Sequence, residues 1–214
     1  MNSPRSQTDG CPCGILFILS GPSGVGKDSV LRRALPRLGS IRTSISVTTR
    51  APRPTERDGV DYIFVAPEAF RTMQQHDQLL EYADVHNHCY GTPREWVFTQ
   101  LQAGTDVVLE IDVQGAVQVR AHFPDAILIF LAPPNWSELA RRLRKRGTED
   151  EATIRRRLDN ARHELARVHD YEYLIINDDI NEATDRLCAV VLAERARPWR
   201  QNLRHLLSEE ISNE

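Results

Sequence analysis

A glycine-rich sequence directly after a short apolar run limits the possible folds of this chain more than any other feature. Residues 15–20 are the apolar run, and Gly21-Pro22-Ser23-Gly24-Val25-Gly26-Lys27 after it has the spacing GxxxxGK. Between a strand and a helix, such glycines let backbone N–H groups point at phosphate oxygens, and the lysine reaches the β- and γ-phosphates. The same residues could form a simple helix-capping turn. The strand before them and the helix after them favour a site for a nucleoside triphosphate.

Apolar runs of strand length alternate with amphipathic segments over most of the chain. This pattern predicts an α/β fold whose central parallel sheet is covered on both faces. Expected strands are 15–20, 41–49, 106–112, 126–132 and 172–177; expected helices are 27–38, 93–102, 114–122, 136–145, 151–168 and one from about residue 182. Between 61 and 91 the pattern changes to short strand-like pieces around the helical segment PEAFRTMQQH. We interpret that stretch as a small β-rich lobe inserted in the main fold.

Length and charge exclude several functional classes. A chain of 214 residues can bury one substantial core, so one catalytic domain is the default expectation. The formal net charge of −3 provides no overall field for binding nucleic acid or an acidic membrane. Apolar runs stop well short of the roughly 18 residues of a membrane span. Residues 1–13 lack the apolar segment of a signal peptide and are expected to be a disordered arm.

The sequence contains four cysteines, of which Cys11 and Cys13 are two positions apart. Their spacing invites a metal or redox interpretation, but neither has a partner cluster of His or Cys, and Cys89 and Cys188 show no ligand spacing. We therefore expect free thiols in a reducing cytosol, and hence a cytoplasmic protein.

The phrase Ser46-Val47-Thr48-Thr49-Arg50-Ala51-Pro52-Arg53 indicates a second, local anion site. Arg50 and Arg53 are three residues apart on a proline-stiffened segment, so they can clasp one phosphate from two sides. Tyr62 and Tyr90 are phenols that can donate hydrogen bonds to the same phosphate. Taken singly, each tyrosine is better explained as part of a core or a sheet surface than as a ligand, and only the assembled pattern favours the ligand role.

Five motifs in this order resemble the guanylate kinase family: GPSGxGK, S-x-T-T-R-x-P-R, G-x-D-Y, Y-G-T at Tyr90 and I-D-x-Q-G. The resemblance runs from about Gly14 to Ala196. It implies a P-loop NTPase three-layer α/β fold with a central parallel sheet, a small β-rich GMP-binding lobe and an Arg-rich helical lid. It also implies transfer of the γ-phosphoryl group of ATP to GMP with Mg²⁺, and no nucleic-acid or membrane partner.

The same resemblance divides the chain into parts. It implies a guanylate kinase-like domain over 14–196, between the N-terminal arm and a C-terminal tail of 197–214. Within it the core would comprise 14–45, 93–134 and 169–196, the GMP-binding lobe 46–92, and the lid about 135–168.

Guanine carries donors at N1 and at its 2-amine, so it requires a partner that only accepts hydrogen bonds, such as a carboxylate. The resemblance assigns this role to Glu81, although an acid on a strand ordinarily faces solvent. It adds Ser46 and Thr92 to the base pocket, and Arg50, Arg53, Tyr62 and Tyr90 to the GMP phosphate. It also puts Glu110 near the magnesium and its water network, Asp112 near the guanine amine and Asn177 near adenine. Alternatively, Glu110 and Asp112 cap the helix that follows them.

Arg142, Arg146 and Arg157 match arginines of the family's lid, in segments that would otherwise be interpreted as solvated helix faces. Phosphoryl transfer is catalysed by positioning and charge neutralisation, so these arginines are the expected catalytic groups, together with Lys27 and Arg50. The acceptor is already an anionic phosphate, so no catalytic histidine is expected.

The phosphate loop departs from its usual pattern at one position. The Ser or Thr that ligates magnesium is replaced by Asp28, and Ser29 follows it. We expect Asp28 to hold the metal directly or through water. Two other functions share parts of the pattern. One is a binding module that retains the fold without turnover, and the other is a kinase for another phosphorylated small molecule, such as a ribose bisphosphate.

Overall fold

The computed structural model describes residues 13–85, 88–145 and 151–201. A five-stranded sheet has the order β2-β7-β1-β8-β9 and all its strands are parallel. Its strands are β1 (Leu16–Ser20), β2 (Ile41–Thr43), β7 (Asp106–Glu110), β8 (Ile127–Ala132) and β9 (Tyr173–Ile176). Every residue of β1 and β8 is buried, as expected for central parallel strands covered on both faces.

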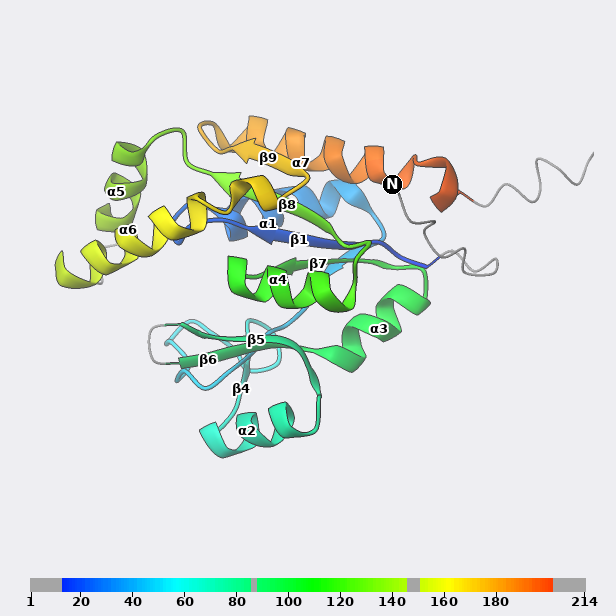
Figure 1. The fold of residues 1–214 in the computed structure, drawn as a ribbon, viewed down its shortest axis with the longest axis horizontal. Coiled ribbons are helices and arrows are strands. Elements are labelled where there is room, and N and C mark those ends of the chain that lie inside the picture. The colour runs from blue at the N-terminus through cyan, green and yellow to red at the C-terminus, as the bar shows by residue number, and fades with distance from the viewer. Residues whose placement is uncertain (1–12, 86–87, 146–150, 202–214) are drawn as a thin grey trace, which may run out of the picture.

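Helices cover the sheet on both sides (Figure 1). One face packs against α1 (Lys27–Leu38) and α7 (Ile180–Arg195), and the other against α3 (Arg94–Gln102) and α4 (Val113–His122). This three-layer arrangement confirms the predicted fold class. Among the described residues, no helix is both long enough and apolar enough to cross a membrane.

A second, four-stranded sheet has the order β4-β3-β6-β5 and lies apart from the first (Figure 1). It comprises β3 (Val47–Thr48), β4 (Ile63–Phe64), β5 (Leu79–Val85) and β6 (His88–Pro93), with α2 (Pro67–Gln75) packed on it. The sequence predicted strand-like pieces and a helix here, and the structure has them.

The segment that the sequence predicts as a lid contains α5 (Trp136–Lys145) and α6 (Glu151–Leu165). Their contact is a small apolar cluster of Leu139, Leu143, Ile154 and Ala161. In Figure 1 the two helices form the left end of the molecule, beyond the ends of the strands of the large sheet. Short 3₁₀ turns follow at Val168–Asp170 and Pro198–Arg200.

Several predicted elements were wrong in extent, among them the strand expected over 106–112, which ends at Glu110. The expected strand 41–49 is divided between the two sheets, because its first residues pair with β7 and Val47 and Thr48 pair with β4 and β6. The helix expected to reach Val168 ends at Leu165. The last helix begins at Ile180, two residues early, because Asp179 caps it by accepting from the N–H groups of Asn181 and Glu182.

Several predictions concern residues outside the described part of the chain. These are Arg146, Cys11 and nearly all of the N-terminal arm and the C-terminal tail. The proposed limits of the domain, lobe and lid remain predictions. Cys13, Cys89 and Cys188 are free thiols.

Candidate active site at the phosphate loop

The phosphate loop joins the carboxyl end of β1 to the start of α1. Open parallel sheets bind their ligands outside the carboxyl ends of the strands, and the loop lies there. Gly26 has a φ of 100°, and a Cβ there would lie 2.7 Å from the side-chain nitrogen of Asn177. Only glycine suits both the left-handed backbone and the close approach. The Lys27 ammonium donates to the Gly21 carbonyl at 2.6 Å, so the lysine lies across the loop that it belongs to.

Two arginines of the lid contact this loop. From α5, Arg142 donates to the carbonyls of Val25 at 3.3 Å and Asn177 at 3.0 Å. From α6, Arg157 donates to the Ser23 hydroxyl at 2.8 Å. Helices α5 and α6 therefore bring positive charge to the phosphate loop from outside the sheet.

Asn177 supports the loop from the end of β9. Its side chain is 4% exposed and donates to the Val25 carbonyl at 2.7 Å. Arg142 donates to the same carbonyl, so the two side chains together hold the loop at Val25. The expected place of Asn177 near adenine stays a prediction.

Arg50, Tyr62 and Tyr90 form a second cluster, with the Arg50 guanidinium at its centre. Its Nε donates to the Tyr90 hydroxyl at 3.2 Å, and its guanidinium lies 5.3 Å from the ring centroid of Tyr62. The rings of Tyr62 and Tyr90 are themselves 6.0 Å apart in an edge-to-face arrangement. Three of the four predicted phosphate ligands thus lie together.

The fourth, Arg53, is connected to this cluster through Glu56, which sequence reasoning missed. The Glu56 carboxylate accepts from the Arg50 guanidinium and from the Arg53 backbone N–H, both at 2.8 Å, while the Arg53 side chain is 68% exposed. Burial alone would raise the pKa of Glu56, but the Arg53 N–H and the Arg50 guanidinium lower it. The Arg53 guanidinium lies 3.7 Å from the same carboxylate, so both arginines can be directed at one anionic group.

Glu81 is buried, contrary to the ordinary expectation for an acid on a strand. The register of β5 shifts between Leu79 and Glu81, so Leu79, Leu80 and Glu81 are all buried in succession. Glu81 is 5% exposed and accepts from the Thr92 hydroxyl at 2.6 Å. Burial raises the pKa of Glu81 to about 7; the Thr92 hydrogen bond lowers it and Asp112 raises it further.

The remaining predicted base-pocket residue, Ser46, is half-buried directly before β3, and its carbonyl accepts from the Ile63 N–H at 2.9 Å. The sequence predicted that Glu110 and Asp112 share one face, and the burial of Ile111 between them agrees with this. Asp112 also caps α4, since its carboxylate accepts from the Gly115 N–H at 2.8 Å.

Arg32 on α1 forms an ion pair with Asp28, the expected magnesium ligand. Its Nε is 2.8 Å from the Asp28 carboxylate, whose side chain is 61% exposed. The hydrogen bond with Asp28 is the largest cause of the raised pKa of Arg32, and the charges of Asp61 and Glu110 add to it. Ser29 is exposed. The described residues contain no group of three or more His, Cys, Asp or Glu side chains placed to hold a metal.

A second acid that the sequence did not single out is Glu164, on α6. Its Oε2 is buried and has no hydrogen-bond partner among the described atoms. Burial raises the pKa of Glu164 to about 7, while the nearby Lys27 lowers it and Asp112 raises it. In sequence it is one of many acids on an arginine-rich helix, so no local signal could have identified it.

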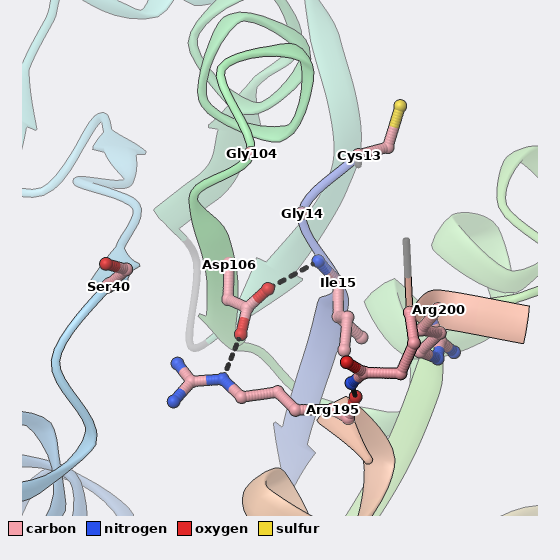
Figure 2. Close-up of a pocket in the computed structure, with 9 residues that line it drawn as sticks. Cys13, Gly14, Ile15, Ser40, Gly104, Asp106, Arg195 and Arg200 are labelled. Carbon is pink, nitrogen blue, oxygen red and sulfur yellow. Dashed lines mark hydrogen bonds and ion pairs between the residues drawn. The ribbon is translucent and has the colours of Figure 1, made fainter. Parts of the chain in front are cut away.

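A separate pocket of about 230 Å³ opens at the end of the large sheet opposite the phosphate loop (Figure 2). There the Asp106 carboxylate accepts from the Ile15 N–H and from the Arg195 guanidinium, each at 2.7 Å. Arg195 also donates to the Leu38 carbonyl at 2.6 Å. The pocket lies at the amino ends of the parallel strands, so we interpret these contacts as attaching α7 to the sheet.

Comparison with known proteins agrees with this geometry. The family model described as guanylate kinase matches residues 14–194. A guanylate kinase of Desulfitobacterium hafniense (strain Y51) is 47% identical over 188 residues, covering 88% of this chain and 94% of that protein. One from Thermobifida fusca (strain YX) is 49% identical over 178 residues, covering 83% and 91%. The crystal structure of guanylate kinase from Anaplasma phagocytophilum superimposes with a TM-score of 0.78 at 34% identity, covering 94% of this chain and 97% of that one.

Proposed function

This chain belongs to the guanylate kinase family and is an ATP:GMP phosphotransferase, and we propose that the residues around the phosphate loop divide the work of that reaction. The products are ADP and GDP. The choice of GMP as acceptor is supported best by one observation, the buried Glu81 carboxylate held by Thr92. Guanine offers two donors on one edge, and a carboxylate accepts both.

We assign the triphosphate of ATP to the phosphate loop, residues 21–27, and Ser29. The loop's N–H groups and the start of α1 favour negative charge, and Lys27 can exchange its contact with the Gly21 carbonyl for phosphate oxygens. Asn177 remains our candidate near adenine.

We assign the phosphate of GMP to Arg50, Arg53, Tyr62 and Tyr90. The guanidinium groups of Arg50 and Arg53 lie 2.8 Å and 3.7 Å from the same Glu56 oxygen, and this convergence on one anion supports the role. We assign the base to Glu81, Ser46 and Thr92, with Asp112 beside the 2-amine. The acceptor oxygen is already ionised, so no side chain has to remove a proton.

We assign transfer itself to the positive charge of Lys27, Arg50, Arg142 and Arg157, with Arg146 as a further member. Negative charge is spread over the oxygens of the migrating phosphoryl group in the transition state, and fixed cations stabilise it while the lid excludes water. The contacts of Arg142 and Arg157 with the phosphate loop support this assignment.

The donor chemistry of Asp28 and Glu110 fits a magnesium ion. With a nucleotide present, Mg²⁺ needs only one or two protein carboxylates, because phosphates and water supply the other ligands. We therefore propose that Asp28 holds the ion directly or through water, with Glu110 in its water network. When bound, Mg²⁺ neutralises charge between the phosphates.

We further propose a domain over 14–196 with a GMP-binding lobe over 46–92 and a lid over about 135–168. The separate sheet of β3 to β6 supports the lobe, and the pairing of α5 with α6 supports the lid. GMP and GDP are purine nucleotides, so we infer a role in purine nucleotide metabolism. The free thiols of Cys13, Cys89 and Cys188 suit the reducing cytoplasm.

The direct test is ADP formation from ATP with GMP, dGMP, AMP, a ribose bisphosphate or no acceptor, at several magnesium concentrations. We expect turnover only with guanine nucleotides. Turnover with AMP at a comparable kcat/KM would contradict the base-reading role of Glu81. Turnover with the ribose bisphosphate would contradict the assignment of Glu81, Ser46 and Thr92 to a base.

Replacing Asp28 with Ala should raise the magnesium concentration for half-maximal rate by about tenfold or more, in the range seen when a metal's supporting groups are removed. Titration of the rate with MgCl₂ at saturating nucleotides measures this. Arg32→Ala is the matched control, because it releases Asp28 from its ion pair and should not increase the magnesium requirement. If Asp28→Ser increased the rate by orders of magnitude at saturating magnesium, Asp28 would be a defect and not a ligand.

A further inference from the structure

Helix α4 contacts the outer edge of strand β5 through one glutamine side chain. The Gln118 amide nitrogen donates to the Tyr82 carbonyl at 2.7 Å, and its amide oxygen accepts from the Tyr82 N–H at 3.1 Å. β5 is the last strand of its sheet, so on this side Tyr82 has no neighbouring strand. The primary amide of Gln118 supplies one donor and one acceptor, as a paired strand would.

Tyr82 directly follows Glu81, so this contact restrains the backbone beside the proposed guanine-reading carboxylate. Glu81 itself rests on the same helix. A Cβ at Gly115 would lie 2.5 Å from the Glu81 Oε2 and 3.1 Å from its Cδ, so a side chain at 115 and the present position of Glu81 exclude each other. Gly115 and Gln118 are three residues apart on α4 and therefore lie on one face.

Two neighbours thus define the position of the Glu81 carboxylate. The Thr92 hydroxyl of β6 donates to its Oε1, and its Oε2 occupies the space that a side chain at Gly115 of α4 would fill. Asp112 fixes the start of α4 by accepting from the Gly115 N–H. Figure 1 shows α4 between the large sheet and β5, so it links the strand to the part of the fold that contains the phosphate loop.

We propose that Gln118 is a positioning residue for guanine recognition, which fixes β5 at Tyr82 so that Glu81 is held over Gly115 in the orientation that the two donors of guanine require. This inference rests on the proposed role of Glu81. A carboxylate displaced by about 1 Å from two donors can lose about a hundredfold in rate. Gln118 therefore determines specificity although it contacts Tyr82, the residue next to Glu81, and not Glu81 itself.

The test compares GMP with IMP, a nucleotide that lacks the 2-amine and so makes one hydrogen bond fewer. In Gln118→Ala we expect the KM for GMP to rise about tenfold or more, and the preference for GMP over IMP to shrink by a similar factor. The KM for ATP should stay unchanged. A purely structural role of Gln118 would lower the active fraction for both nucleotides and leave their ratio as it was.

Three further variants, one of them a control, distinguish the positioning role from a general loss of activity. Gln118→Glu retains an acceptor for the Tyr82 N–H but repels its carbonyl, so its effect should have the same direction as that of Gln118→Ala. Gly115→Ala introduces a methyl group against Glu81 and should reduce the GMP preference more strongly, while alanine favours the helix by about 1 kcal/mol. Gln102→Ala, at an exposed position in the last turn of α3, is the matched control and should behave as the unmodified protein.

The outcomes separate the two proposals. If Gln118→Ala and Gly115→Ala leave the GMP-to-IMP ratio unchanged while Glu81→Gln reduces it, the positioning role is wrong and the proposed function stands. If Glu81→Gln itself leaves GMP use unchanged, the base-reading role of Glu81 is wrong. Thermal unfolding of each variant distinguishes altered recognition from loss of the fold, since Tyr82 is exposed and water can replace the amide of Gln118.

Discussion

Glu81→Gln is expected to lower kcat/KM for GMP about 10³- to 10⁴-fold. The carboxylate can accept hydrogen bonds from both N1–H and the 2-amine of guanine, whereas the amide of glutamine would place its own NH₂ group against one of them. The replacement has nearly the same size and removes a buried carboxyl group, so the protein should remain folded. Steady-state kinetics with GMP at saturating ATP measure the effect.

The control for this substitution is the ATP side of the reaction. The KM for ATP should change little, since the phosphate loop and the lid are formed by other elements. The loss should be confined to the use of GMP. A parallel loss for ATP and GMP would indicate damage to the fold and would contradict a role limited to the base.

Glu81 also predicts a pH dependence. Burial raises its pKa to about 7, and guanine's donors require the ionised form, so the KM for GMP should rise as the pH falls below about 7. The limit is about tenfold for each pH unit. The GMP phosphate titrates near pH 6 as well, so the difference between the unmodified protein and Glu81→Gln isolates the carboxylate.

The same group affects stability with the opposite dependence on pH. Without GMP, the pKa of Glu81 in the folded protein lies above the ordinary value of 4.5, so the folded state binds more protons in that window. Its contribution to the free energy of unfolding is complete below about pH 4.5 and is lost as the pH rises through about 7. Denaturant unfolding of the unmodified protein and of Glu81→Gln, at several pH values, tests this sign.

Arg142→Met should lower kcat about 10²- to 10³-fold, the usual effect of removing one group that stabilises transition-state charge. Arg142 reaches the carbonyls of Val25 and Asn177 at the phosphate loop, and no described contact connects it to the GMP-binding lobe. The KM for GMP should therefore stay nearly constant. Single-turnover measurements separate the transfer step from product release.

Arg141 provides a closely matched control on the same helix. Arg141 and Arg142 both donate to the Glu138 carboxylate, and these hydrogen bonds, with that from Arg141 the larger, lower the pKa of Glu138 to about 2. Only Arg142 also contacts the phosphate loop. Arg141→Met removes the same charge from α5 and should change kcat by less than about twofold, as for an exposed ion pair. Equal effects of the two substitutions would show that general charge on the lid matters and the individual contact does not.

The extended segment 41–49 shows where sequence reasoning stopped. Its β-branched residues correctly predicted extended backbone, but backbone propensity does not specify a partner strand. The first part pairs with β7 and the later part with β4 and β6, so one predicted strand became two in different sheets. The helix cap at Asp179 was similarly hidden within a sequence, Asn-Asp-Asp, that is also typical of a turn.

By itself the sequence determined the phosphate loop, because seven consecutive residues between a strand and a helix specify its backbone and its lysine together. It also determined the family through motifs in a fixed order, and it identified Arg50, Tyr62, Tyr90 and Glu81 as ligand candidates. Only the tertiary structure decided that Glu81 is buried over Gly115, that Glu56 joins the two arginines, and that Gln118 holds the edge of β5. The physical reason is distance along the chain. Gln118 and Tyr82 are separated by 36 residues, and such contacts exist only after the lobe has packed on α4.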